Sequence, residues 1–204
     1  MNHTFEQRAG ELVEAGRILY DLGMVPATSG NFSARVAEDC FAITVSGMHK
    51  GRMTTDDIMQ VNANGQSPDN RRPSAETGLH MQIYRRFPKV CAILHPHSLY
   101  ATLLSRQVAD EVVLADYELL KAFPGIDTHE SRLQVPVFDN DQNIARLAKK
   151  VDAYMDTNAS IHGYLIRGHG FYTWGESMEA ALRHVEAFEF LFKCELMMRG
   201  GVQA

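Results

Sequence analysis

The stretch VCAILHPH, residues 90–97, predicts a buried strand that ends in two histidines. Its first five residues form an uninterrupted apolar run, typical of a strand covered on both faces. Alternate residues of an extended chain point to the same side, and Pro96 favours an extended backbone at His95. The imidazoles of His95 and His97 can therefore converge on one ion. Taken alone, the pair is equally typical of a turn after a strand.

Helical and extended segments alternate on both sides of this strand. Apolar spacing and end signals predict helices over 5–22, 74–87 with Ser74 as N-cap, from near Ser98, from the 139–141 cluster to about 155, and over 177–198. Strands are expected at 31–36 and 41–45, which form a hairpin, and at 134–138, 161–166 and 171–174. A short helix capped by Thr54 or Thr55 leads to 58–61, and 117–123 forms a short helix or turn. The pattern predicts an α/β protein with a mixed or largely antiparallel sheet covered by helices.

The charge, apolar runs and cysteines of the chain exclude several functional classes. The 204 residues carry 20 Lys and Arg against 25 Asp and Glu, a net charge of -5, so nucleic-acid binding is not expected. No apolar run is long enough to span a membrane, and the first twenty residues lack the apolar segment of a secretory signal. The three cysteines, Cys40, Cys91 and Cys194, are widely spaced, which favours a reducing cytoplasm. We expect one continuous domain over residues 1–204, with its core at about 8–198.

A third histidine strengthens the metal hypothesis. His169 lies between Gly168 and Gly170, where flanking glycines allow a close backbone approach in the turn between two predicted strands. Three histidines with one open position are typical of catalytic zinc, whereas structural zinc sites usually recruit cysteines. No CxxC spacing occurs here, so the cysteines are interpreted as ordinary thiols.

Small-residue turns point to an anion site. The segments 28–31 and 45–47 offer hydroxyls and glycine-exposed backbone N–H groups, and Ser74 stands at a predicted helix N-terminus. Each turn alone is more typical of a simple turn. Together, and with Lys50 close in sequence, they predict a nest for a phosphate group.

Two glutamates are candidate acid/base groups. Glu76 lies in the first predicted helical turn, where acidic residues are common, and with His80, four residues on, it could form merely a surface pair. Glu118 precedes Lys121 by three residues, so an exposed helix face is its ordinary interpretation. Sequence spacing does not choose between the two carboxylates.

The ordered set of these motifs resembles the class II aldolase family of zinc enzymes that act on phosphorylated sugars. The resemblance covers about residues 8–198 and rests on the segments 29–31, 45–47, 73–76, 95–97 and 168–170. Within that family, the segments 117–123, 128–130 and 135–141 are similar to a dehydratase branch that acts on a phosphorylated ketose.

The resemblance implies a central, mostly antiparallel sheet between helix layers and a homo-oligomer, with a cyclic tetramer favoured and sites near subunit interfaces. It implies one Zn²⁺ per subunit on His95, His97 and His169. It also implies a substrate phosphate surrounded by Gly30, Asn31, Ser46, Gly47 and Ser74. The residue matching Glu76 is the acid/base in the aldolases, and the one matching Glu118 in the dehydratases. Many aldolases have a second serine where this chain has Ala75, so a phosphate contact there would use backbone N–H.

The resemblance thus predicts a cytoplasmic, zinc-dependent dehydratase whose acid/base is Glu118 and whose substrate-binding residues include Glu76. An aldolase or epimerase acting on another sugar phosphate is the alternative enzyme. A third alternative is a non-catalytic, adducin-like assembly module. Such modules are expected to lack the metal ligands, and all three histidines are present here.

Overall fold

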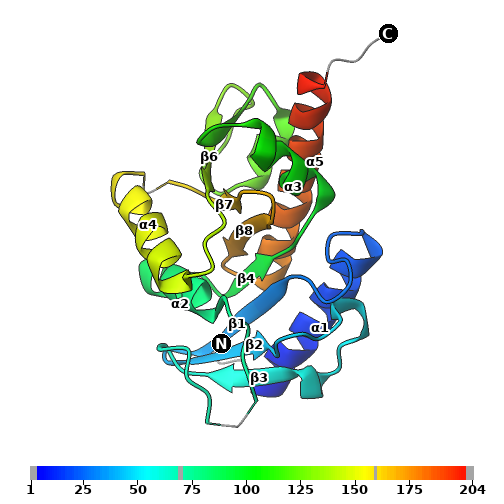
Figure 1. Cartoon of the computed structure of the whole chain (residues 1–204), viewed down its shortest axis with the longest axis vertical. Helices are drawn as coiled ribbons and strands as arrows, with labels where there is room; N and C mark the ends of the chain where they lie inside the picture. Colours follow the sequence, from blue (N-terminus) through cyan, green and yellow to red (C-terminus); the bar gives the residue numbers. More distant parts are fainter. Residues whose placement is uncertain (1–3, 69–70, 159, 201–204) are drawn as a thin grey trace.

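An eight-stranded sheet runs through the computed structural model, which describes residues 4–68, 71–158 and 160–200 (Figure 1). The strands are β1 (Asn31–Ala37), β2 (Cys40–Thr44), β3 (Ile58–Val61), β4 (Ala92–His95), β5 (Glu111–Ala115), β6 (Arg132–Phe138), β7 (Gly163–Ile166) and β8 (Gly170–Gly175). Their order across the sheet is β3-β2-β1-β4-β8-β7-β6-β5. Neighbours are antiparallel except for the parallel pair β6 and β7. The predicted α/β class with a mostly antiparallel sheet is confirmed.

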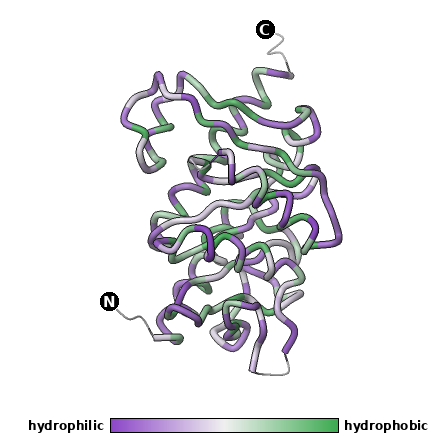
Figure 2. Tube along the Cα trace, turned by 90° about the vertical axis from the view of Figure 1, so that its left-hand side faces the viewer, coloured by the Kyte–Doolittle hydropathy of each residue, from purple (hydrophilic) through white to green (hydrophobic). Residues whose placement is uncertain are grey.

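Helices cover both faces of the sheet. They are α1 (Phe5–Asp21), α2 (Thr77–Arg86), α3 (Leu99–Gln107), α4 (Ile144–Thr157) and α5 (Met178–Arg199), with short 3-10 helices η1 (Lys50–Arg52), η2 (Thr55–Asp57) and η3 (Glu118–Ala122). One core lies between the sheet and α1, α3 and α5, and a second core lies between the sheet and α2 and α4. Figure 2 shows hydrophobic and hydrophilic positions mixed along the elements rather than gathered into one apolar run. No helix in the described part of the chain is long and apolar enough to cross a membrane.

The strands divide their side chains between the two cores with a period of two. In β1, Phe32 and Ala34 enter the α1 side, while Ser33 is buried on the α2 side. In β8, Phe171 joins the first core, whereas Tyr172 and Trp174 join the second. Both faces of the central strands are buried, but the strand predicted at 90–94 is observed two residues later, as β4, and Cys91 before it is only partly buried.

Most predicted elements are confirmed, including the first and last helices and the hairpin of β1 and β2. The prediction of Ser74 as a helix N-cap is wrong, because α2 begins at Thr77 with Glu76 as its N-cap residue. The Ser74 carbonyl accepts hydrogen bonds from the Thr77 N–H (3.1 Å) and hydroxyl (2.7 Å), which closes a turn before the helix. The Glu76 side chain makes no capping hydrogen bond and is free to serve the site.

Two further differences lie near the sheet edge. The cap of α4 is Asn143 rather than a residue of the 139–141 cluster, since its side chain accepts the Arg146 N–H at 3.0 Å. Asp141 instead pairs with the Arg146 side chain (2.5 Å). Strand β5, which the sequence patterns did not predict, is the edge strand beside β6.

Candidate metal centre and anion pocket

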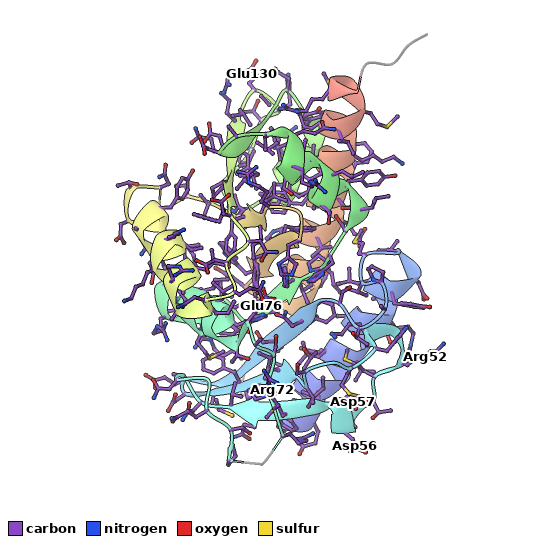
Figure 3. All side chains as sticks on the ribbon, in the orientation of Figure 1. Arg52, Asp56, Asp57, Arg72, Glu76 and Glu130 are labelled. Carbon is purple, nitrogen blue, oxygen red and sulfur yellow. The ribbon has the colours of Figure 1, made fainter. Side chains whose placement is uncertain are left out.

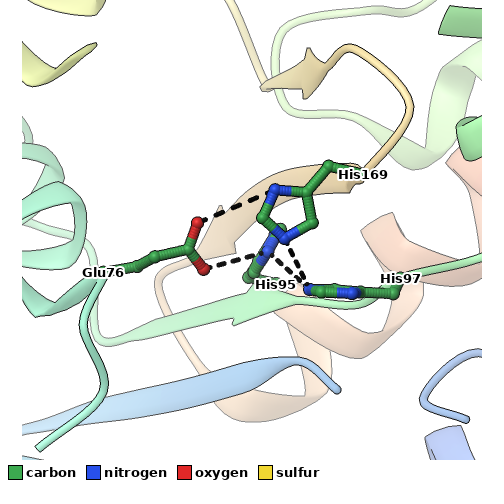
Figure 4. Close-up of side chains that lie close together, drawn as sticks. All are labelled: Glu76, His95, His97 and His169. Carbon is green, nitrogen blue, oxygen red and sulfur yellow. Dashed lines mark hydrogen bonds and ion pairs between the residues drawn. The ribbon is translucent and has the colours of Figure 1, made fainter. Parts of the chain in front are cut away.

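Three histidines from two neighbouring loops converge at one end of the sheet. His95 is the last residue of β4, His97 follows it, and His169 lies in the turn between β7 and β8. The His97 Nε2 atom lies 3.0 Å from His95 Nε2 and 2.9 Å from His169 Nε2 (Figure 4). Gly170 makes this approach possible, because a Cβ atom there would collide with the Pro96 carbonyl oxygen. The three predicted ligands are thus brought together.

The surroundings of the three histidines orient His95 and favour neutral rings at His97 and His169. His95 is fully buried, and its Nδ1 lies 2.8 Å from the Phe171 carbonyl oxygen, so Nδ1–H donates and Nε2 faces the other rings. The Tyr172 ring stacks on His95 with centroids 4.1 Å apart. Burial, together with the neighbouring His95 and His169, lowers the pKa of His97 to about 3, and burial also lowers that of His169. Neutral imidazole is the form that binds a divalent metal.

Glu76 completes the cluster from α2. Its Oε2 lies 3.2 Å from His95 Nε2, and its Oε1 lies 3.9 Å from His169 Nδ1. One ligand atom from each of the four residues lies within 4.8 Å of the others. Figure 3 shows Glu76 in the middle of the molecule, whereas Asp56, Asp57 and Glu130 lie towards its ends. A carboxylate beside three convergent imidazoles is a donor set that suits zinc and other divalent ions.

Opposing effects act on the Glu76 carboxyl group. Burial alone would raise its pKa, but the neighbouring His95 and His169 and the hydrogen bond from the Asn31 amide lower it well below the usual range. The Asn31 amide donates to Glu76 Oε2 at 2.8 Å. Glu76 is therefore an oriented carboxylate at neutral pH.

A pocket of about 280 Å³ opens beside the cluster. It is lined by every residue predicted to bind substrate, namely Gly30, Asn31, Ser46, Gly47, Ser74 and Glu76, together with His97 and His169. Gly30 and Gly47 adopt positive φ values of 78° and 80°, which suits glycine in turns that expose backbone N–H groups. The buried Ser29 hydroxyl also lines the pocket and has no hydrogen-bond partner among the described residues. These groups match an anionic ligand.

Lys50 supplies positive charge to this pocket. Its side chain is 2% exposed, and its Nζ donates to the carbonyl oxygens of Thr28 (3.2 Å) and Met48 (2.6 Å). Burial lowers the pKa of Lys50 to about 8. The sequence placed Lys50 near the predicted nest, but only the structure shows that it lines the same pocket.

Asn31 and His80 have roles that the sequence patterns missed. The Asn31 side chain is occupied by Glu76 and by His80, whose Nε2 lies 2.5 Å from Asn31 Oδ1. His80 is fully buried, so a surface pair with Glu76 is wrong. The available signal was a polar residue at every fourth position of the second helix, at 76, 80 and 84.

Glu118 does not lie near the three histidines and Glu76 of its own chain. It begins η3, its side chain is 73% exposed, and its Oε1 accepts a hydrogen bond from Lys121 at 2.6 Å. Lys121 lowers the pKa of Glu118. It is not among the residues that line the pocket.

Comparisons with known proteins match nearly the whole chain. A sequence profile described as the Class II Aldolase and Adducin N-terminal domain matches residues 10–196. The methylthioribulose-1-phosphate dehydratase of Methylococcus capsulatus is 60% identical over 96% of both chains. The Pseudomonas aeruginosa protein of that name is 53% identical over 96% of this chain and 97% of its own.

Solved structures give the same fold. The L-fuculose-1-phosphate aldolase of Thermus thermophilus superposes with a TM-score of 0.75 at 27% identity, covering 94% of this chain and 95% of its own. YgbL of Escherichia coli superposes with a TM-score of 0.81 at 21% identity, covering 98% of this chain and 92% of its own, which is a likeness of fold.

Proposed function

Since the chain belongs to the Class II Aldolase and Adducin N-terminal domain family, we propose that it is a metal-dependent lyase, a methylthioribulose-1-phosphate dehydratase. The reaction converts 5-methylthioribulose 1-phosphate to 2,3-diketo-5-methylthiopentyl 1-phosphate and water, a step of methionine salvage. The observation that carries the proposal is the convergence of His95, His97, His169 and Glu76 beside an anion pocket in a chain 60% identical to a protein of that name.

We propose zinc as the metal, one ion per subunit, on the Nε2 atoms of the three histidines. The fit rests on their convergence and on the Phe171 carbonyl, which fixes the His95 tautomer. When bound, the ion would act as a Lewis acid that polarises the C2 carbonyl and makes the C3 proton more acidic.

The chain's own residues would bind and orient the substrate. The turns around Gly30 and Gly47, with Ser46, Ser74 and Lys50, hold the phosphate through N–H, hydroxyl and ammonium groups. Glu76, held beside His95 and His169, would accept a hydrogen bond from a substrate hydroxyl.

We assign proton transfer to Glu118. Its carboxylate takes the C3 proton, the C4 hydroxyl leaves as water with a proton returned by the same group, and tautomerisation gives the diketone. Because Glu118 lies outside the pocket of its own chain, this role needs a neighbouring subunit whose η3 reaches the site.

An exposed apolar surface supports a homo-oligomer, with a tetramer favoured. It is formed by Leu99 and Leu103 of α3, Leu119 of η3, and Phe190, Met197 and Met198 of α5. Apolar groups gathered on packed neighbouring elements are typical of an interaction surface. Leu119 follows Glu118 directly, so burial of this surface would carry Glu118 to a subunit interface.

Product analysis tests the function. Purified protein with methylthioribulose 1-phosphate should give a product lighter by one water in mass spectrometry. A chelator should abolish turnover, and added Zn²⁺ should restore it. Two carbonyl fragments would indicate an aldolase. An epimeric product of unchanged mass would indicate an epimerase, and no stoichiometric metal would favour the adducin-like module.

We place the reaction in the cytoplasm. The support is that Cys40, Cys91 and Cys194 are all free thiols in the described structure. Secretion with intact activity would contradict this location.

A further inference from the structure

A buried chain of polar side chains extends from Glu76 into the second core. Its members are Glu76, Asn31, His80, Ser33 and Tyr84, and we refer to them as the polar chain. Successive links measure 2.8 Å from Asn31 Nδ2 to Glu76 Oε2, 2.5 Å from Asn31 Oδ1 to His80 Nε2, 2.7 Å from His80 Nδ1 to Ser33 Oγ, and 2.9 Å from Ser33 Oγ to Tyr84 OH. Asn31, His80, Ser33 and Tyr84 are each at most 6% exposed.

Two periodicities build the polar chain. His80 and Tyr84 lie on one side of α2, and Glu76, the N-cap residue four positions before His80, continues the same spacing. Asn31 and Ser33 are spaced by two residues and lie on one face of β1. Asn31 also pairs with His95 across β1 and β4, so the polar chain begins beside a metal-cluster residue.

The carboxylate sets the direction of every hydrogen bond. An ionised carboxylate only accepts, so Asn31 must turn its NH₂ group to Glu76 and its Oδ1 to His80. His80 Nε2 must then carry the hydrogen. Burial lowers the pKa of His80 to about 3, so the ring is neutral and its Nδ1 is an acceptor. Ser33 therefore donates to His80, and Tyr84 donates to Ser33.

The orientation of the Asn31 amide in turn determines how the Glu76 carboxylate is held. A free Asn side chain can present either its oxygen or its nitrogen, and an oxygen beside Glu76 would repel the carboxylate. When its Nε2 carries the hydrogen and its Nδ1 accepts from Ser33, His80 donates only to the Asn31 oxygen, which leaves the Asn31 NH₂ group facing Glu76. Fully satisfied buried networks of this kind make one arrangement much more stable than the others.

We propose that His80 is a positioning residue for Glu76: with Ser33 and Tyr84 it fixes the Asn31 amide, which holds the Glu76 carboxylate on the three histidines. The proposal deepens the proposed function but concerns a geometry that exists before any substrate binds. It assigns no proton transfer to His80.

Substitutions at His80 provide the main test. His80→Leu should lower kcat about 10- to 100-fold, the usual cost of losing an outer partner of a metal site, with KM changed much less. His80→Gln keeps an amide donor near the Nε2 position and should recover most of the activity. Tyr84→Phe removes only the last hydroxyl and should cost about two- to tenfold.

A second readout does not require turnover. In protein loaded with Co²⁺, the visible absorption reports the groups around the ion. His80→Leu should change that spectrum in the same direction as Glu76→Gln, while His80→Gln should resemble the parent protein.

His184→Leu is the matched control, because His184 is 2% exposed and donates through Nδ1 to the Trp174 carbonyl (2.7 Å) in the other core. Its kcat and Co²⁺ spectrum should stay unchanged. A His80→Leu protein with the parent kcat and spectrum would overturn the proposal, as would equal losses in His184→Leu. If the parent protein fails to dehydrate methylthioribulose 1-phosphate but the spectra differ as expected, the proposed function fails and the positioning role stands.

Discussion

Individual side chains in this site have functions that depend on what surrounds them. Lys50 is the clearest case, because a lysine is rarely buried without a carboxylate partner. Here two carbonyl oxygens hold its ammonium group at the edge of the anion pocket. Its charge is then available to a ligand phosphate.

Removing the Lys50 charge should weaken substrate binding. Lys50→Met should raise KM about 10- to 100-fold, since a charge-assisted hydrogen bond contributes about 1.5–3 kcal/mol, with a smaller effect on kcat. Steady-state kinetics measure this, and Lys149→Met, an exposed lysine on α4, is the control. An unchanged KM in Lys50→Met would remove Lys50 from the phosphate site.

The same residue predicts a pH dependence. Lys50 is charged below its pKa of about 8 and loses that charge as pH rises through this value. KM should therefore increase from about pH 8 upward in the parent protein and stay flat over that range in Lys50→Met. A parallel rise in both proteins would assign the dependence to another group.

Glu118 is the second residue with a distinct test. Glu118→Gln should lower kcat by about 10²- to 10⁴-fold, the usual contribution of a general base, while metal content stays stoichiometric. Glu130→Gln, a glutamate at the end of the molecule in Figure 3, should be fully active. Full activity in Glu118→Gln would shift the acid/base assignment to Glu76.

At the scale of elements, His97 and His169 lie close together because the loop after β4 and the turn between β7 and β8 pack against each other. The turn between β7 and β8 packs onto the residues that follow β4, and the Phe171 N–H donates to the Pro96 carbonyl (3.2 Å). Gly170 is the residue that leaves room for this contact. A side chain there would meet both the Pro96 carbonyl and the His97 Cα.

Gly170→Ala should therefore separate His97 from His169. We expect weaker metal binding and a loss of about 1–3 kcal/mol in the free energy of unfolding, as for other overpacked sites. Metal titration and chemical denaturation measure the two effects. Gly10→Ala, in α1 with nothing within 4 Å of the added carbon, should bind metal normally and be equally or more stable. Normal metal affinity in Gly170→Ala would show that the two loops can move apart to accommodate the added methyl group without separating the histidines.

The type of most helices and strands could be predicted from the sequence, but the residues at which they begin depend on local hydrogen bonds. Ser74 has the residue type of an N-cap, but its carbonyl closes a turn with Thr77 and the helix begins three residues later. Strand β5 pairs only with β6 at the sheet edge. Its apolar run, residues 112–115, is one residue shorter than the run at 90–94, lies between acidic residues and is only alternately buried.

For the whole molecule, the exposed apolar side chains of α3, η3 and α5 support the proposed oligomer. Phe190 is 54% exposed and Met198 is 70% exposed on the same helix. Covering them in an oligomer would remove apolar area from water and bring Glu118 to the interface.

A charge on this surface should dissociate the oligomer. Phe190→Glu should shift sedimentation velocity profiles to a smaller species and reduce kcat as strongly as Glu118→Gln, while the isolated fold keeps its helix content. Glu186→Lys, an exposed position on the same helix, should leave the assembly intact. A fully active monomer would contradict the interface role of Glu118.

The sequence by itself determined the α/β class, the three histidines and the turns of the anion pocket, because these depend on local periodicity and on short motifs. The predicted helix also contains residues 76, 80 and 84 at four-residue spacing, and the predicted strand contains residues 31 and 33 at two-residue spacing, but of these only Glu76 and His80 were predicted to be possible partners. Only the tertiary structure decided that these two sets face each other, that Lys50 reaches the pocket and that Glu118 does not. Contacts between distant segments depend on how the layers pack, and residue spacing carries no information about that packing.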